Sequence, residues 1–170
     1  MFQYRVVDVK ADRDLLLDLH CRINYESETK WAREVPYEDY REKWLSTSQT
    51  EQFLSDLKGS LEDERTIAEI AEDDGVLIGY IRVTYMDIRD YNVTAAEIMD
   101  IMVTPERQRQ GIGLELMKHI EEQALARGAA VVRSDTGIEN TASQKLHEKC
   151  GFKPYRVRYE KVLSDVELTD

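Results

Sequence analysis

A glycine-rich turn in the second half of the chain has residue types and spacing that favour binding of a phosphate group. The turn reads Gln108-Arg109-Gln110-Gly111-Ile112-Gly113 and precedes a segment with helical periodicity. The first N–H groups of a helix lack intrahelical partners and lie at the positive end of the helix dipole, where an anion is stabilised. The two glycines would let a ligand approach the main chain, and Arg107 and Arg109 add positive charge. The alternative is a helix start whose glycines serve only a tight turn.

The elements that must position this turn follow from the spacing of apolar residues. The predicted strands are residues 2–9, 66–71, 76–85, 95–103, 129–134 and 152–163. Residues 11–18 have helical spacing, residues 24–58 predict two short helices separated by a loop at Pro36, and further helices are predicted over residues 113–127 and 140–149. Asp74-Gly75 favours a hairpin between the second and third strands.

These elements predict an α/β protein. We expect a mixed, mostly antiparallel central sheet flanked by helices, in the order βααβββαβαβ. The length of 170 residues predicts one domain, over residues 1–163, followed by an acidic tail at residues 164–170.

Composition excludes some classes of partner. Asp and Glu number 34 against 23 for Lys and Arg, a net charge of -11, so the surface should repel nucleic acid. The acidity favours a cationic partner, or it only keeps the protein in solution. No apolar run approaches the roughly 18 residues of a membrane span, and residues 1–9 have no leader pattern, so we expect a cytoplasmic protein. We expect no metal, because the histidines share no ligand spacing with one another or with the cysteines.

The turn and its surroundings resemble a known family. Gln108-x-x-Gly111-x-Gly113 matches the Gln/Arg-x-x-Gly-x-Gly/Ala signature of the GNAT (Gcn5-related) N-acetyltransferases. Residues 100–106 upstream, and Asn140-Thr141-Ala142-Ser143 and Lys149-Cys150-Gly151-Phe152 downstream, match the family in order. The resemblance covers residues 66–163 well and the N-terminal third only in its strand–helix–helix order.

The resemblance implies a GNAT-like fold and acetyl-CoA as cosubstrate. It implies that backbone amides of residues 108–113 hold the pyrophosphate and that Asn140 lies near the thiol end of the cosubstrate. It also implies that Ile101, Met102 and Val103 pair, strand-like, with the pantetheine arm. Physically, CoA needs an anion site beside an unpaired strand edge, and a bulge in the strand that ends at Val103 could open such an edge.

Acetyl transfer also needs a base, because a protonated ammonium is not a nucleophile. Histone-acetylating members of the family place a general-base glutamate where this chain has Glu97, eleven positions before Gln108. Polyamine-acetylating relatives often carry an acidic residue at the position of Asp100, where it can hold a substrate ammonium or relay its proton. Strand alternation puts the two carboxylates on opposite faces unless a bulge intervenes, so we expect at most one in the cleft and favour Asp100.

The resemblance also suggests a general acid for the leaving thiolate. Many members carry a tyrosine directly after the leucine that corresponds to Leu146, in a Leu-Tyr-Glu-Lys-x-Gly-Phe run. In this chain His147 takes the place of that tyrosine. An imidazolium with a reference pKa near 6.5 can donate a proton, and the alternative is a packed histidine beside the cosubstrate. A subset of aminoglycoside 6′-acetyltransferases shares the spacing of Asn140, Ser143 and His147 before Gly-Phe.

The N-terminal region supplies the acceptor wall in this family. Its aromatic residues here are Trp31, Tyr37, Tyr40 and Trp44, and its glutamates are Glu26, Glu28, Glu34 and Glu38. Together they could receive a cationic amine, and helix packing is the alternative for the aromatics.

We therefore expect an N-acetyltransferase that moves the acetyl group of acetyl-CoA to a primary amine by direct attack in a ternary complex. The expected acceptor is a small cationic molecule, aminoglycoside- or polyamine-like. A protein N-terminus or lysine is the alternative acceptor, and an acyl-CoA sensor without catalysis is the alternative outside the enzymes. Family members often form dimers, which leaves a homodimer open for this chain.

Overall fold

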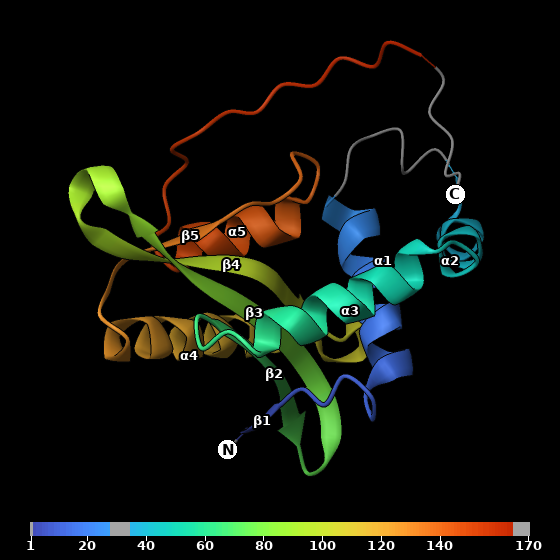
Figure 1. Cartoon of the computed structure of the whole chain (residues 1–170), viewed down its shortest axis with the longest axis horizontal. Coiled ribbons are helices and arrows are strands. Elements are labelled where there is room, and N and C mark those ends of the chain that lie inside the picture. Colours follow the sequence, from blue (N-terminus) through green and yellow to red (C-terminus); the bar gives the residue numbers. More distant parts are fainter. Residues whose placement is uncertain (1, 28–34, 165–170) are drawn as a thin grey trace.

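The computed structural model describes residues 2–27 and 35–164, and their arrangement is shown in Figure 1. The described residues form one sheet with the strand order β1-β2-β3-β4-β5. The strands are β1 (Gln3–Val6), β2 (Thr66–Asp73), β3 (Val76–Ile88), β4 (Val93–Val103) and β5 (Ala129–Ser134). Neighbouring strands are antiparallel except β4 and β5, which are parallel. The mixed, mostly antiparallel sheet expected from the sequence is confirmed.

The helices cover both faces of this sheet. They are α1 (Arg13–Ser27), α2 (Tyr37–Leu45), α3 (Gln49–Leu61), α4 (Ile112–Ala126) and α5 (Thr141–Lys149). One apolar cluster joins α4 residues such as Leu116 to Ile81 of β3, and the other joins Leu17 of α1 and Leu57 of α3 to Ile70 of β2. The sheet therefore separates α4 from the three N-terminal helices (Figure 1).

Local turn chemistry explains the hairpin between β2 and β3. Asp74 and Gly75 both have positive φ, 51° and 76°, and Asp73 pairs directly with Val76. Two successive residues with positive φ match the right-handed twist of the flanking strands, which is why Asp-Gly is favoured there. The hairpin prediction is confirmed.

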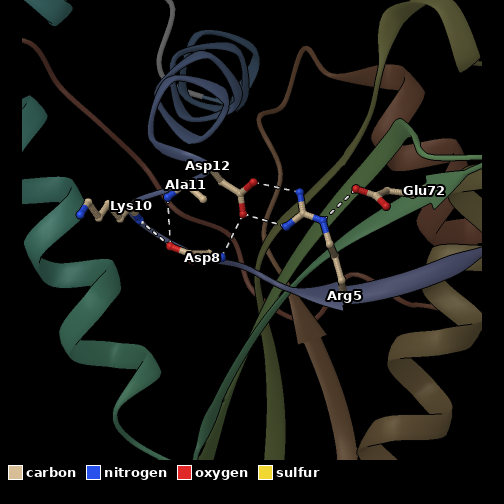
Figure 2. Close-up of polar contacts among 6 residues, drawn as sticks. All are labelled: Arg5, Asp8, Lys10, Ala11, Asp12 and Glu72. Carbon is tan, nitrogen blue, oxygen red and sulfur yellow. Dashed lines mark hydrogen bonds and ion pairs between the residues drawn. The ribbon is translucent and has the colours of Figure 1, made fainter.

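A polar network fixes the start of the chain against the sheet. Arg5 of β1 donates from Nη1 and Nη2 to the two carboxylate oxygens of Asp12 at 2.8 Å, and from Nε to Glu72 of β2 at 2.8 Å (Figure 2). Asp12 also accepts the backbone N–H of Asp8 at 2.9 Å. The network joins β1, β2 and the turn before α1, so it aligns α1 with the sheet.

A β-bulge interrupts β4 near its middle. Arg82 of β3 is opposite Asp100, and the next residue, Val83, is opposite Ile98, so Met99 has no partner in β3. A bulge of this kind breaks the alternation of side chains between the two faces. Ile98 and Ile101, three positions apart, accordingly pack into the same cluster with α4.

The chain end and the helix count differ from the predicted order βααβββαβαβ. The structure has three N-terminal helices, so that order counts one helix too few. Their bounds also differ from the prediction, because α1 continues past residue 18 to Ser27 and both α2 and α3 follow Pro36, divided at residues 46–48. The closing strand predicted over residues 152–163 is wrong: these residues have no regular secondary structure and leave α5 as an irregular trace in Figure 1. The observed order is βαααβββαβα.

The absent strand has a physical reason. Tyr155, Val157 and Tyr159 alternate with charged residues, which is the pattern of a half-buried strand. A strand is stable only where another strand pairs with its backbone groups, and no described strand pairs with this segment. These three side chains are 54%, 76% and 91% exposed, so they are not part of the core.

Among the described helices, none is long and apolar enough to cross a membrane. Within the same residues, no group of three or more histidine, cysteine, aspartate or glutamate side chains could hold a metal ion.

Candidate active site

The glycine-rich turn lies between the end of β4 and the start of α4. Residues Pro105–Arg107 form one turn of 3-10 helix, and Arg109 and Gly111 then take positive φ, 60° and 86°. Gly111 is the N-cap of α4, and a residue with a Cβ is strained at this φ. The side chain of Gln108 donates to the carbonyl of Val103 at 3.4 Å, which folds the turn back on β4.

The backbone of this turn presents unpaired donors. Among the described residues, the N–H groups of Gly111, Ile112 and Gly113 have no hydrogen-bond partner, whereas Leu114 N donates to Gly111 O at 3.0 Å. These three donors lie at the positive end of the α4 dipole. Arg109 is exposed beside them, and Arg107 lies 3.7 Å from Asp73, which offsets part of its charge. The geometry suits a phosphate group.

The strand that leads into the turn has a free edge. Parallel pairing between β4 and β5 ends at Ile98 and Ser134, so the two strands separate beyond this point. Ile101, Met102 and Val103 pair with β3 on one side and with no described strand on the other. An extended amide chain could pair with such an edge.

The bulge at Met99 changes the placement of the two candidate carboxylates. Glu97 lies between Ala96 and Ile98, which pack toward α4, so its side chain lies on the other face. Asp100 follows the bulge and forms an ion pair with Arg82, whose neighbours Ile81 and Val83 also pack toward α4. Glu97 and Asp100 therefore share the face of the N-terminal helices. The prediction that the two carboxylates lie on opposite faces assumed a strand without a bulge, and the bulge at Met99 removes that condition.

The environments of the two carboxylates differ. Glu97 is half-buried and has no hydrogen bond or ion pair with another described residue. Burial raises the pKa of Glu97, the negative charge of Asp135 raises it further, and Arg133 and Arg156 oppose the change. An unpaired carboxylate with a raised pKa is suited to accept a proton near neutral pH.

Asp100 is 8% exposed and lies beside a cation. Its Oδ2 is 2.8 Å from Arg82 Nε, in an ion pair whose angle is not that of a hydrogen bond. Burial raises the pKa of Asp100, and the charge of Arg82 acts in the opposite direction. Arg82 was not among the residues predicted for the site, although a charged residue within the apolar run of residues 76–85 indicates a buried partner.

Helix α5 brings two further candidates to this end of the sheet. A Cβ on Gly113 would lie 3.1 Å from Leu146 Cδ2, so α5 packs closely against the start of α4. Asn140 is the N-cap of α5, and its Oδ1 accepts the N–H of Ser143 at 3.1 Å. No hydrogen bond from Asn140 Nδ2 to another described residue is present, so this donor is available to a ligand.

His147 has one occupied and one unoccupied ring nitrogen. Nδ1 lies 2.7 Å from the carbonyl oxygen of Ser143, so it carries a hydrogen and donates. Nε2 is buried and has no partner among the described residues. The ring meets Phe152 edge to face, with centroids 5.1 Å apart, and this contact holds its plane.

The aromatic residues of the N-terminal region divide into two groups. Tyr40 and Trp44 are buried in the cluster beneath α1–α3, as helix packing predicts. Tyr37 is half-buried, its hydroxyl has no partner among the described residues, and the guanidinium of Arg22 lies 5.1 Å from its ring centroid. Trp31, with Glu28 and Glu34, lies outside the described residues.

Comparisons with known proteins identify the family of the chain. The pattern of the acetyltransferase (GNAT) family matches residues 28–152. An aminoglycoside N(6′)-acetyltransferase type 1 from Salmonella typhimurium is 31% identical over 104 residues, which is 59% of this chain and 71% of that protein. A ribosomal protein bS18-alanine N-acetyltransferase from Escherichia coli is 33% identical over 63 residues, 37% of this chain and 43% of that protein.

A solved structure shares the fold. A predicted acetyltransferase from Clostridium acetobutylicum, crystallised with acetyl-CoA, superimposes with a TM-score of 0.70 over 96% of this chain and 97% of that chain, at 16% identity. At this identity the likeness concerns the fold alone. With the family match over most of the chain, it leads to one conclusion: the chain belongs to the GNAT family and is an acetyl-CoA-dependent N-acetyltransferase.

Proposed function

We propose that this protein transfers the acetyl group of acetyl-CoA to a primary amine of a small cationic molecule, aminoglycoside- or polyamine-like, by direct attack in a ternary complex. The observation that carries the proposal is the bulge at Met99, which turns Glu97 and Asp100 to one face beside the free edge of β4. The aminoglycoside-acetylating relative from Salmonella typhimurium supports the acceptor class.

The residues present fit acetyl-CoA along its length. The unpaired N–H groups of Gly111, Ile112 and Gly113 would hold the pyrophosphate, with Gln108, Arg109 and Gln110 around it. The free edge formed by Ile101, Met102 and Val103 would pair with the pantetheine amides. Asn140 would donate from Nδ2 near the thiol end.

Acetyl-CoA supplies a thioester whose carbonyl carbon accepts the amine. Glu97 would take the proton that the ammonium must lose, because its carboxylate is half-buried, unpaired and raised in pKa. Asp100 would keep its place through its ion pair with Arg82, whose charge offsets that of the carboxylate. The unpaired carboxylate of Glu97 would attract a cationic acceptor, since the attraction between opposite charges is stronger in a partly desolvated site.

His147 would return a proton to the leaving thiolate. Its Nδ1 donates to the carbonyl of Ser143, so the ring orientation is fixed and Nε2 is the nitrogen left for chemistry. A protonated Nε2 would be the donor, because an imidazolium carries a hydrogen on both ring nitrogens and Nδ1 is already engaged.

Thiol release from acetyl-CoA tests the proposal. We expect thiol release that depends on an aminoglycoside or polyamine. When the concentrations of both substrates are varied, the double-reciprocal plots of the initial rate should intersect, as a ternary complex requires. Parallel double-reciprocal lines would instead indicate a mechanism in which the enzyme itself is first acetylated. If the Cys150→Ser variant then lost its activity, the acetylated group would be Cys150. Release with a peptide N-terminus alone would favour a protein acceptor, in line with the Escherichia coli relative. CoA binding without release from any amine would indicate a sensor.

A further inference from the structure

A buried ion pair crosses from β3 to β4 at the bulge. Arg82 Nε lies 2.8 Å from Asp100 Oδ2, and the two side chains are 19% and 9% exposed. Arg82 is opposite Asp100, and Val83 is opposite Ile98, so the pair lies beside the unpaired Met99. Among the described residues, no other carboxylate forms an ion pair with Arg82.

A β4 strand without the bulge would place Asp100 differently. Counting forward from Ile98, Met99 would lie opposite Arg82, and Asp100 would lie opposite Ile81. Asp100 would then turn toward α4, where Ile81 and Leu116 are fully buried. Burying a carboxylate without a partner in that cluster would strongly destabilise the folded protein, and Arg82 would lose its partner as well.

We propose that Arg82 is a positioning residue for acetyl transfer, because its ion pair with Asp100 fixes the bulged register of β4. The inference rests on the proposed function, since it concerns the same site. The bulged register brings Glu97 to the face of Asp100 and precedes the free edge of residues 101–103. Arg82 thereby acts on the base and on the cosubstrate edge without contacting the acetyl group.

The groups around the pair fit this role. Tyr80, two positions before Arg82 on the same face, has a buried hydroxyl with no partner among the described residues, and burial raises its pKa, so it stays neutral. From α1, His20 lies near Arg82, and burial together with the charge of Arg82 lowers the pKa of His20 to about 4. Both neighbours are uncharged at neutral pH. Of the described carboxylates on this face, Asp12 and Glu72 pair with Arg5, Asp18 pairs with Arg22 and Arg41, and Asp100 is the one that pairs with Arg82.

Three variants distinguish a positioning role of Arg82 from a role in protein stability alone. Arg82→Met leaves Asp100 buried without a partner, so the melting temperature should fall and CoA should bind about tenfold more weakly. Arg82→Met with Asp100→Leu removes both buried charges, so stability should recover while the register stays unspecified. Arg82→Lys keeps the charge and should restore CoA affinity to within about threefold of wild type.

For each variant we would measure the CoA affinity by calorimetry, the melting temperature, and the KM and kcat with acetyl-CoA. We expect the double variant to melt like wild type and still bind CoA about tenfold more weakly. Wild-type CoA affinity in the double variant would overturn the proposal. Arg5→Met is the matched control, because it breaks a sheet ion pair far from the bulge, and it should lower the melting temperature without changing CoA affinity.

Two further outcomes remain decisive. If the double variant does not fold, Arg82→Met is compared with Arg5→Met, and equal losses of CoA affinity would overturn the role of Arg82. CoA binding is measured without an acceptor, so an absence of acetylation would contradict the proposed function alone. Unchanged CoA affinity in the Arg82 variants would contradict only the positioning role.

Discussion

Glu97 and Asp100 lie on the same face of β4, although the two residues are three positions apart. The bulge at Met99 adds one residue to β4 between them, so the side-chain alternation resumes one position later. Asp100 is paired with Arg82, and Glu97 has no ion pair with a described residue. This difference favours Glu97 as the base and Asp100 as the residue that holds the strand in place.

Gly111→Val should weaken CoA binding by about tenfold or more, because a β-branched residue is strained at φ 86° and the turn must shift its free N–H groups. The fold should persist, since a Cβ at this position meets no atom within 4 Å. Calorimetry with CoA measures the effect. Gly59→Ala in α3 is the control, because its Cβ would also meet nothing, and its CoA affinity should equal that of wild type.

Glu97→Gln should lower kcat by about a hundredfold if Glu97 is the base. The deprotonated carboxylate is the active form and its pKa is raised above the ordinary 4.5 by burial, so kcat/KM should fall as the pH falls through that raised pKa. The variant should lose this acid limb. A pH–rate profile with the same acid limb in wild type and variant would assign the proton to water or to the substrate.

His147→Ala should lower kcat more than it weakens CoA binding, because Nε2 is proposed to act on the leaving thiolate rather than on the ground state. A loss of about a hundredfold is the scale of a general acid. His147→Tyr supplies another proton donor at this position and should retain more activity than alanine. Normal turnover of His147→Ala across pH 6–9 would return His147 to a packing role.

Asp12→Asn should destabilise the protein by about 1 kcal/mol at neutral pH, a value reduced because Arg5 is partly exposed. The side-chain hydrogen bonds from Arg5 lower the pKa of Asp12 below its ordinary 3.8. The free energy of unfolding that Asp12 contributes is therefore fully present above pH values near the ordinary pKa. It is lost as the pH falls through the lowered pKa of the folded state. Urea unfolding at several pH values should show the two proteins converging in acid.

The control for Asp12→Asn is Asp14→Asn, since the Asp14 side chain is 99% exposed and its contact with Arg13 is 3.6 Å long. This control should change stability by less than about 0.5 kcal/mol. A loss equal to that of Asp12→Asn would show that helix charge, rather than the network in Figure 2, sets the difference.

Local sequence patterns were enough to predict most of the helices and strands and to identify the family. Asp74-Gly75 specified its hairpin because both residues tolerate positive φ, and the turn at residues 108–113 specified the start of α4 because Gly111 can take the φ required there. These features depend on a few neighbouring residues. The closing strand over residues 152–163 could not be judged in this way, because alternation shows that a segment can form a strand and not that a partner strand is present.

Which of the two carboxylates has an ion-pair partner depends on contacts between strands. The bulge at Met99 depends on the pairing of β4 with β3, and the partner of Asp100 is Arg82, eighteen residues earlier in the chain. A bulge has no reliable local signature, because it is stabilised by contacts between strands that the spacing along one strand does not contain. The face that Glu97 and Asp100 share is therefore a property of the folded sheet.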